Sequence, residues 1–196
     1  MYTAKLETEA ILRLAAIEFA EQGYEGMSMR ALADKCSVTA GALYHHFSSK
    51  EDLYDEVCNK IFDDVVNVIE QSVVSARTPE ESMERFVFAL FDQWTKSRHI
   101  LIMTQRDAIS AATHPEHRFA MPHFKRLFDA IRRIQSQILE TEVAEATAFA
   151  FGAMIFGYCS LMVYPQQESG LNADRYIAKR RIELLHFCKV FLASIR

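Results

Sequence analysis

Donor side chains gather in one short stretch near the start of the chain. Tyr44, His45, His46 and Lys50 supply a phenol hydroxyl, two imidazoles and an ammonium group. Such groups are typical donors to the phosphates of nucleic acid. Residues 40–42, which read Ala-Gly-Ala, are too small to build a core. Their small side chains would let the backbone come close to another surface.

Two short helices joined by a tight turn are expected to carry these donors. Ser28 is a good N-cap for the first helix, and Met29, Leu32 and Ala33 give it an inward face. The helix is not expected to continue unbroken through residues 36–38. The pattern predicts a helix-turn-helix.

The second short helix has a cap and an inward stripe of its own. Thr39 is the expected N-cap. Leu43 and Phe47 are four residues apart and therefore fall on one side of the helix.

A longer helix over residues 5–21 is expected to cover the two short ones. Its apolar side chains share one stripe, made of Ile11, Leu12, Ala15, Ala16 and Phe19. Gly23 is expected to end this helix in a left-handed conformation, with Tyr24 folded back onto it. The helix is scaffold, because the short helices could not bury their apolar residues alone.

Composition indicates an all-α globular protein. The chain has 196 residues, half of them hydrophobic, with only six Gly and four Pro, and no strand periodicity is evident. The net charge is −4, and residues 1–50 hold five basic against six acidic side chains, which argues against a general polyanion binder. No secretory signal is evident, and the four scattered cysteines indicate reduced thiols in the cytoplasm.

Helical spacing continues through the rest of the chain. A long helix is expected from Ser49 to about Ala76, followed by helices from Thr78 to about Trp94, from about Arg98 to Ala112, from Met121, from Thr141 to Tyr164 and after Asn172. We therefore predict an N-terminal three-helix DNA-binding domain over 1–50. A larger helical domain is predicted over 51–196.

The segment from Thr141 to Tyr164 carries no charge after Glu145 and has large apolar residues in every direction. A transmembrane span is the alternative interpretation, since the uncharged length is close to that of a bilayer core. We favour a helix covered by its own domain on one side and by an identical subunit on the other. The last two helices of each chain would then form a four-helix homodimer interface.

The stretch from about residue 9 to residue 53 resembles the DNA-binding signature of the tetracycline-repressor (TetR) family. The resemblance is carried by Ile11-Leu12, Ala15-Ala16, Phe19-Ala20-Glu21, Gly23-Tyr24, Ser28-Met29-Arg30, Leu32-Ala33, Val38-Thr39, Gly41-Ala42-Leu43-Tyr44, His46-Phe47 and Ser49-Lys50-Glu51. The family implies three N-terminal helices on an operator and a helical domain that dimerises and holds a small-molecule effector. Ser37 departs from the family, which usually has Gly in the turn.

The resemblance also implies roles for single residues. Ser28, Tyr44 and Lys50 would contact DNA phosphates, whereas Thr39, Ala40, Ala42 and His45 would face base edges. By the same comparison His46 would pack near Phe47 as a structural residue.

An effector pocket is expected in the larger domain, because a regulator of this kind needs one and helical bundles can enclose it. Its candidate lining consists of Phe62, Phe86, Phe91, Trp94, Met103, Phe124, Phe128, Phe149, Met154 and Tyr158, with Arg106, His123 or Gln105 as polar anchors. Core packing is the simpler interpretation for each residue alone. The effector would be mainly apolar.

Two further groups have a simpler explanation that we favour. His114, Glu116, His117 and His123 could supply metal ligands, but their spacing matches no known site, so we expect a solvated loop and no metal or other cofactor. Cys36 could sense oxidants, but no resolving cysteine is near it in sequence.

The expected function is that of a ligand-responsive, dimeric repressor that binds double-stranded operator DNA. The alternative is a helical carrier of hydrophobic ligands, or an enzyme, using the same apolar interior. No nucleophile, acid pair or phosphate loop in the chain indicates catalysis, so a non-enzyme is expected.

Overall fold

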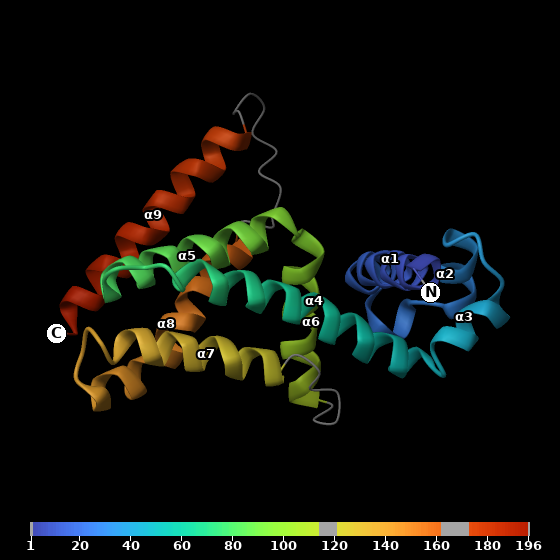
Figure 1. Cartoon of the computed structure of the whole chain (residues 1–196), viewed down its shortest axis with the longest axis horizontal. Helices are drawn as coiled ribbons and strands as arrows, with labels where there is room; N and C mark the ends of the chain where they lie inside the picture. The colour runs from blue at the N-terminus through green and yellow to red at the C-terminus, as the bar shows by residue number, and fades with distance from the viewer. Residues whose placement is uncertain (1, 114–120, 162–172, 196) are drawn as a thin grey trace. The chain divides into compact units, whose positions relative to one another are not determined.

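The computed structural model describes residues 2–113, 121–161 and 173–195, and their side chains over 8–106, 124–161 and 174–195. The described residues form helices and turns and contain no strand, which confirms the predicted all-α class. In chain order the helices are α1 (Tyr2–Gly26), α2 (Met29–Lys35), α3 (Ala40–His46), α4 (Lys50–Val73), α5 (Pro79–Lys96), α6 (Arg98–Thr113), α7 (Met121–Gln135), α8 (Thr141–Leu161) and α9 (Ala173–Ser194) (Figure 1).

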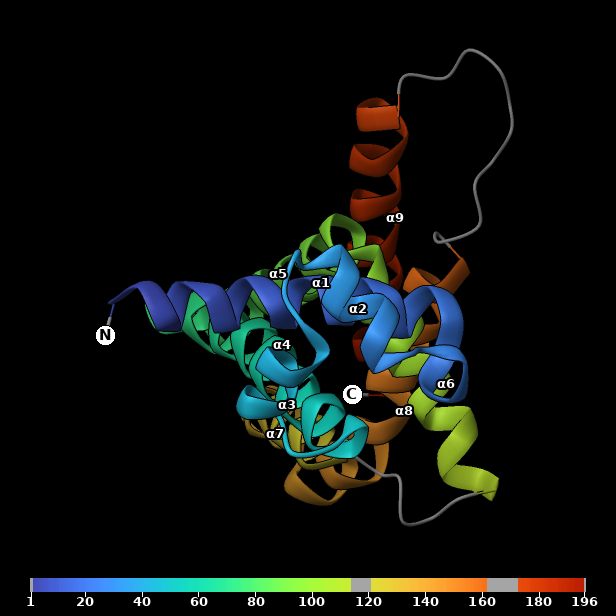
Figure 2. The same ribbon diagram turned by 90° about the vertical axis from the view of Figure 1, so that its right-hand side faces the viewer.

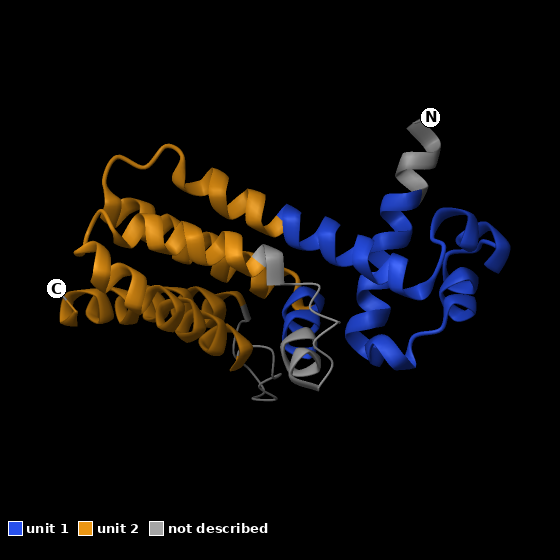
Figure 3. Ribbon diagram, turned by 90° about the horizontal axis from the view of Figure 1, so that it is seen from below, with its two compact units in different colours: residues 1–64, 99–122 blue, residues 65–98, 123–196 orange. Residues whose placement is uncertain are grey.

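The chain divides into two compact units (Figure 3). Unit 1 takes residues 1–64 and 99–122, and unit 2 takes residues 65–98 and 123–196. Helix α4 is continuous through the boundary after Asp64, and α6 belongs to unit 1 from His99 onward. The predicted domain boundary after residue 50 falls at the first residue of α4 and stays a prediction.

Unit 1 is built around α1. Helix α1 packs against α2, and α2 packs against α3 (Figures 1 and 2). The predicted stripe of α1 is buried, as are the inward residues of the short helices, Leu32, Leu43 and Phe47. These three helices form one apolar core that none of them could form alone.

The end of α1 differs from the prediction. Gly23 has a positive φ of 77°, as expected, but its ψ is 170° and helical turns continue beyond this kink to Gly26. Tyr24 folds back as predicted, with its ring centroid 6.1 Å from that of Phe19 and 5.2 Å from that of Tyr54. The aromatic contacts hold the kinked segment against α4.

In unit 2, α5 packs against α8 and α9. The six predicted inward residues of α5, Met83, Phe86, Val87, Leu90, Phe91 and Trp94, are all buried. The predicted cap is present too, since the Thr78 hydroxyl accepts from the Glu81 amide at 3.1 Å and Pro79 opens the helix.

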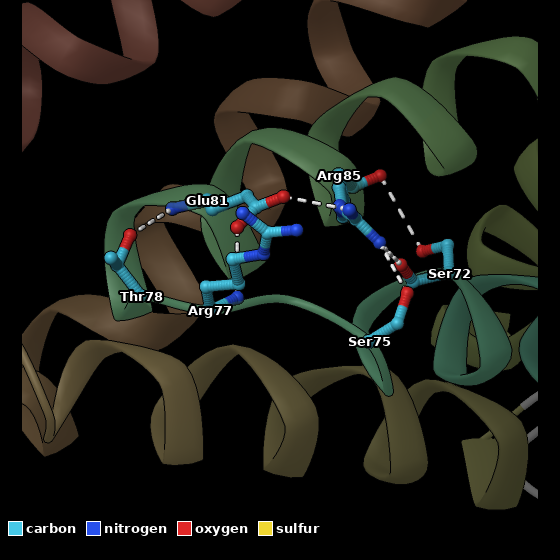
Figure 4. Close-up of polar contacts among 6 residues, drawn as sticks. All are labelled: Ser72, Ser75, Arg77, Thr78, Glu81 and Arg85. Atoms are coloured by element: carbon cyan, nitrogen blue, oxygen red, sulfur yellow. Dashed lines mark hydrogen bonds and ion pairs between the residues drawn. The ribbon is translucent and has the colours of Figure 1, made fainter.

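Arg85 ties α5 to the end of α4 (Figure 4). Its guanidinium donates to the Ser75 hydroxyl at 2.6 Å, to the Glu81 carboxylate at 2.7 Å and more distantly to the Ser72 carbonyl. Glu81 also accepts from the backbone amide of Arg77. These two contacts lower the pKa of the Glu81 carboxyl, with the amide of Arg77 as the larger cause. The side chains of Arg85, Ser75 and Glu81 thereby hold the α4–α5 turn.

Helices α7 and α8 approach closely at Gly152, because a side chain there would collide with Phe128 and Ile131. In the single chain α8 is buried on one side only, and its cover by an identical subunit on the other side stays a prediction. Phe149 and Leu161 are 70% and 71% exposed. Helix α8 is long and apolar enough to cross a membrane, and 33% of its most apolar stretch of 18 residues is buried.

Candidate nucleic-acid interface

Helix α2 begins with the predicted cap. The Ser28 hydroxyl accepts from the Ala31 amide at 3.4 Å while its backbone is extended. Ser28 itself is exposed. Its hydroxyl hydrogen therefore stays available to an outside acceptor such as a phosphate.

The turn between α2 and α3 is a Schellman motif. The amide of Ser37 donates to the Asp34 carbonyl at 3.1 Å, and the amide of Val38 donates to the Ala33 carbonyl at 3.0 Å. Ser37 has φ 57°, and it is the one non-glycine residue with positive φ among those the structure describes. A residue with a β-carbon in this conformation costs about 1 kcal/mol.

Helix α3 is capped at its start and buried on the side of Leu43, and its opposite side faces outward. The Thr39 hydroxyl accepts from the Ala42 amide at 3.1 Å, and Leu43 is fully buried. Tyr44 is 51% exposed and His45 is exposed, whereas Ala40 and Ala42 are half-buried. The predicted contact residues of α3 therefore include a long polar pair at one end and small residues at the other.

His46 is exposed and lies near two residues that can hold its ring in place, Thr8 and Phe47. Its Nδ1 lies 3.4 Å from the Thr8 hydroxyl of α1, and its ring centroid lies 6.2 Å from that of Phe47. The expected proximity to Phe47 is present, and the contact with Thr8 could not be inferred from sequence separation.

Lys50 lies against the end of α1. Its Nζ is 3.4 Å from the carbonyl oxygens of Glu25 and Met27 and 4.6 Å from the centroid of the Tyr24 ring. Carbonyls near a helix end carry partial negative charge and attract a cation. The ammonium thus joins the start of α4 to the end of α1.

A buried carboxylate that the sequence analysis did not single out joins α1 to α2. Glu18 is 5% exposed and contacts the Lys35 ammonium and the Gln22 amide. The spacing of Glu18 and Gln22 by one helical turn was the available signal. Burial and, to a smaller extent, Glu18 raise the pKa of the nearby Cys36 thiol, so the thiolate needed for oxidation is disfavoured.

The predicted effector residues divide between the two units. Phe62, Met103 and Arg106 belong to unit 1, where Phe62 and Met103 are buried and the Arg106 guanidinium donates to the Glu21 carbonyl. Gln105 is half-buried in the same unit. The remaining candidates belong to unit 2, and the side chain of His123 lies outside the described residues.

In unit 2 an aromatic row joins three helices. Trp94 of α5 meets Phe156 of α8 with centroids 5.3 Å apart, and Phe156 meets Phe124 of α7 at 6.4 Å. Phe128 continues the row at 6.4 Å from Phe124 and meets Phe149 at 5.3 Å. Phe156 was missed, although it lies seven residues, two helical turns, from Phe149.

The other candidates of unit 2 lie in different surroundings. Phe86 and Phe91 are buried in α5, and Met154 is half-buried. The Tyr158 hydroxyl donates to the Arg180 carbonyl at 3.1 Å and lies 3.3 Å from the Glu183 carboxylate. Burial and the Glu183 carboxylate raise the pKa of the Tyr158 hydroxyl.

A cavity of about 330 Å³ lies between α5 and α9 and is lined by other residues. They are Glu80, Met83, Glu84, Ile138, Leu185, Cys188, Lys189, Leu192 and Ala193. Lys189 and Glu84 form an ion pair at its edge at 3.1 Å. None of the predicted effector residues lines this cavity.

The structure does not test the histidine loop. His114, Glu116 and His117 lie outside the described residues, as does the side chain of His123. Within the described side chains, no group of three or more His, Cys, Asp or Glu residues is arranged to hold a metal ion.

Comparison with known proteins places this helix-turn-helix in a family. Residues 11–57 match the family described as bacterial regulatory proteins, tetR family. The helix-turn-helix segment of this chain is therefore of the tetR type. The match covers α2 and α3, most of α1 and the first part of α4, which are the elements that form the interface described above.

Named relatives of this chain are transcriptional regulators. The HTH-type transcriptional repressor KstR2 of Mycolicibacterium smegmatis is 27% identical over 139 residues, which are 71% of this chain and 66% of that protein. The match therefore spans slightly less than two thirds of the relative's length.

Solved structures share the fold. That of the ketosteroid transcriptional regulator KstR2 of Mycobacterium tuberculosis has a TM-score of 0.70 at 22% identity, and the match covers 91% of this chain and 93% of that one. The structure of AibR in complex with isovaleryl coenzyme A and operator DNA has a TM-score of 0.69 at 24% identity, with coverage of 88% and 94%.

Proposed function

We propose that the chain is a ligand-responsive transcriptional repressor that binds operator DNA as a cytoplasmic homodimer. The observation that carries the proposal is the outer face of α3. Two side-chain caps and a Schellman turn fix the helix-turn-helix, while Tyr44 and His45 point away from its core as exposed donors. A rigid helix with exposed donors is the arrangement that enters a major groove.

The residues of the interface then have distinct roles. Ser28, Tyr44 and Lys50 bind phosphates and fix the register on the duplex. Thr39, Ala40, Ala42 and His45 face base edges, where the small side chains allow the helix backbone to come close. Thr39 serves twice, because its hydroxyl also caps α3.

Lys50 offers a direct test of this assignment. Replacement of Lys50 by Ala should weaken binding to all DNA sequences alike and reduce the salt dependence of binding by about one unit, since one phosphate contact releases about one counterion. Fluorescence anisotropy at several salt concentrations measures it. Lys60→Ala, which removes a lysine paired with Asp64 on the same helix, is the control. An unchanged slope for Lys50→Ala rejects the phosphate contact.

The dimer is proposed to form through α8 and α9. Phe149 and Leu161 on α8 and Ile182, Phe187 and Val190 on α9 are 53% exposed or more in the single chain. Large apolar side chains gathered on two helices favour an interface with a second copy over permanent exposure to water. We keep this interpretation of α8 in preference to a membrane span.

The effector is proposed to be a mainly apolar small molecule bound in the helical domain. Aromatic side chains from α5, α7 and α8 meet in unit 2, and helix α4 runs from the first residue after the helix-turn-helix into that unit. A ligand that shifts α4 would change the separation of the two recognition helices. Such a ligand lowers operator occupancy only if it binds the two conformations with different affinity.

The deciding experiment uses DNA that flanks the chain's own gene. We expect gel retardation of one fragment, loss of it in Tyr44→Ala and His45→Ala, and release by a member of a panel of ketosteroids, fatty acids and acyl-coenzyme A thioesters. Retardation that persists in both variants contradicts the proposed interface. So does a competition experiment in which unlabelled unrelated DNA removes the retarded band as well as the unlabelled fragment does. Failure of every lipophilic compound to release the fragment contradicts the effector.

A further inference from the structure

Arg106 connects α6 to the end of α1. Its Nη2 donates to the carbonyl oxygen of Glu21 at 3.2 Å across 85 residues of sequence. Both residues belong to unit 1. This hydrogen bond joins a helix of the predicted effector domain directly to a helix of the DNA-binding domain.

The end of α1 is shaped to receive the guanidinium. A β-carbon on Gly23 would collide with Nη1 of Arg106, so the side chain occupies the space that glycine leaves free. Gly23 also has φ 77°, and this kink ends the first, longer part of α1 just after Glu21. A cation that donates to the last carbonyls of a helix is favourably placed.

The kinked segment after Gly23 leads directly into the helix-turn-helix. Met27 donates its amide to the Gly23 carbonyl at 3.2 Å, and Ser28 caps α2 immediately afterwards. Lys50 holds the same segment from α4 through the carbonyls of Glu25 and Met27. Lys50 from α4 therefore fixes the segment that sets where α2 begins, and Arg106 from α6 holds the carbonyl of Glu21 just before that segment.

We propose that Arg106 is a positioning residue for operator binding, through which α6 fixes the end of α1 and the start of the helix-turn-helix. The inference rests on the proposed function. It gives Arg106 a role other than the effector anchor expected from sequence, because the guanidinium contacts the backbone carbonyl of Glu21 and lies against Gly23. A displacement of α6 would reach α2 through this contact.

Arg106→Met tests the proposal, because methionine keeps an unbranched apolar stem and removes the donors. Hydrogen exchange of the full chain should show amides 24–27 exchanging about tenfold faster, the order expected when a charged hydrogen bond is lost. Operator affinity should fall by a similar factor with an unchanged salt slope, since no phosphate contact is lost. Arg106→Lys, which keeps a donor, should recover part of both effects.

Arg98→Met is the matched control, because it makes the same change at an exposed arginine of the same helix. It should alter neither measurement. Exchange that rises throughout the chain in Arg106→Met, or that leaves residues 24–27 unchanged, overturns the proposal. A salt slope reduced by about one unit would make Arg106 a phosphate contact and also overturns it. The exchange readout needs no DNA, so it separates failure of this contact from failure of the proposed function.

Discussion

At the scale of single residues, Ser37 carries strain that its neighbours in the turn do not. The Schellman bonds on either side require a left-handed residue there, and serine provides one at a cost of about 1 kcal/mol. The sequence showed the position of this strain, because Ser37 occupies the place of the family's usual glycine. It could not show that the backbone would keep the left-handed conformation despite the β-carbon.

Ser37→Gly should therefore raise the free energy of unfolding by up to about 0.5 kcal/mol, because the greater flexibility of glycine in the unfolded chain offsets roughly 0.5–1 kcal/mol of the relieved strain. Urea unfolding followed by circular dichroism measures it. Ser37→Ala removes the hydroxyl and keeps the β-carbon, so it should give no such gain. Equal stabilisation by both variants would show that the hydroxyl, and not the backbone, is responsible.

The cysteines should react slowly with alkylating reagents. Burial and Glu18 raise the pKa of Cys36, so less thiolate is present at pH 7.5 than in an unhindered cysteine, and the rate should increase with pH well above that value. Burial raises the pKa of Cys159 and of Cys188 to about 12, so both should react only on unfolding. Iodoacetamide labelling followed by mass spectrometry tests this. Rapid modification of Cys36 at pH 7 would instead favour the oxidant-sensing alternative.

At the scale of helices, local sequence signals located the elements well. Ser28, Thr39 and Thr78 each accept from the amide three residues ahead, and Ser49 does so for Asp52. Side-chain caps are short-range, so the sequence alone can identify them. The end of α1 was predicted less well, because aromatic packing of Tyr24 and the cations on the carbonyls continue the helix past its glycine.

The candidate sites were harder to predict than the helices. The face of α3 follows from helical period once Leu43 and Phe47 are known to be buried. The effector residues could not be sorted in this way, since apolar periodicity does not distinguish a core from a cavity wall. Phe62 and Phe128 look alike in sequence but belong to different units. Long-range contacts such as that of Arg106 with Glu21 leave no pattern at helical spacing.

The exposed face of α8 and α9 makes a prediction about assembly. Phe187→Glu should convert the dimer to monomer, because an unpaired carboxylate would be buried in the interface at a cost of several kcal/mol. Sedimentation velocity over a range of concentrations measures the change. Val74→Glu makes the same substitution at a side chain that is 75% exposed beyond the end of α4 and should leave the dimer intact. A Phe187→Glu protein that stays dimeric would place the interface elsewhere.

At the scale of the whole molecule, affinity is expected to depend on two copies acting together. The net charge is −4, so non-specific attraction to DNA is weak and the match between two recognition helices and two half-sites must supply the binding. Successive major grooves on one side of DNA are about 34 Å apart. Operator binding should therefore be sensitive to half-site spacing.

An insertion of five base pairs between the half-sites should reduce affinity to that of a single half-site, because it turns one of them to the opposite side of the duplex. Anisotropy with the original and lengthened fragments measures the difference. A substitution of five base pairs at the same place keeps the spacing and serves as the control. Equal affinity for the original and lengthened fragments would indicate that one helix-turn-helix binds without its partner.

The glycine at the end of α1 has a consequence for how this protein can evolve. Its φ of 77° and ψ of 170° lie in a region of backbone conformation that is essentially restricted to glycine, so any side chain at position 23 would strain the backbone. The guanidinium of Arg106 is the flexible end of a long side chain and can move aside from a β-carbon at little cost. Position 23 should therefore remain glycine in a selected library even where position 106 has been replaced.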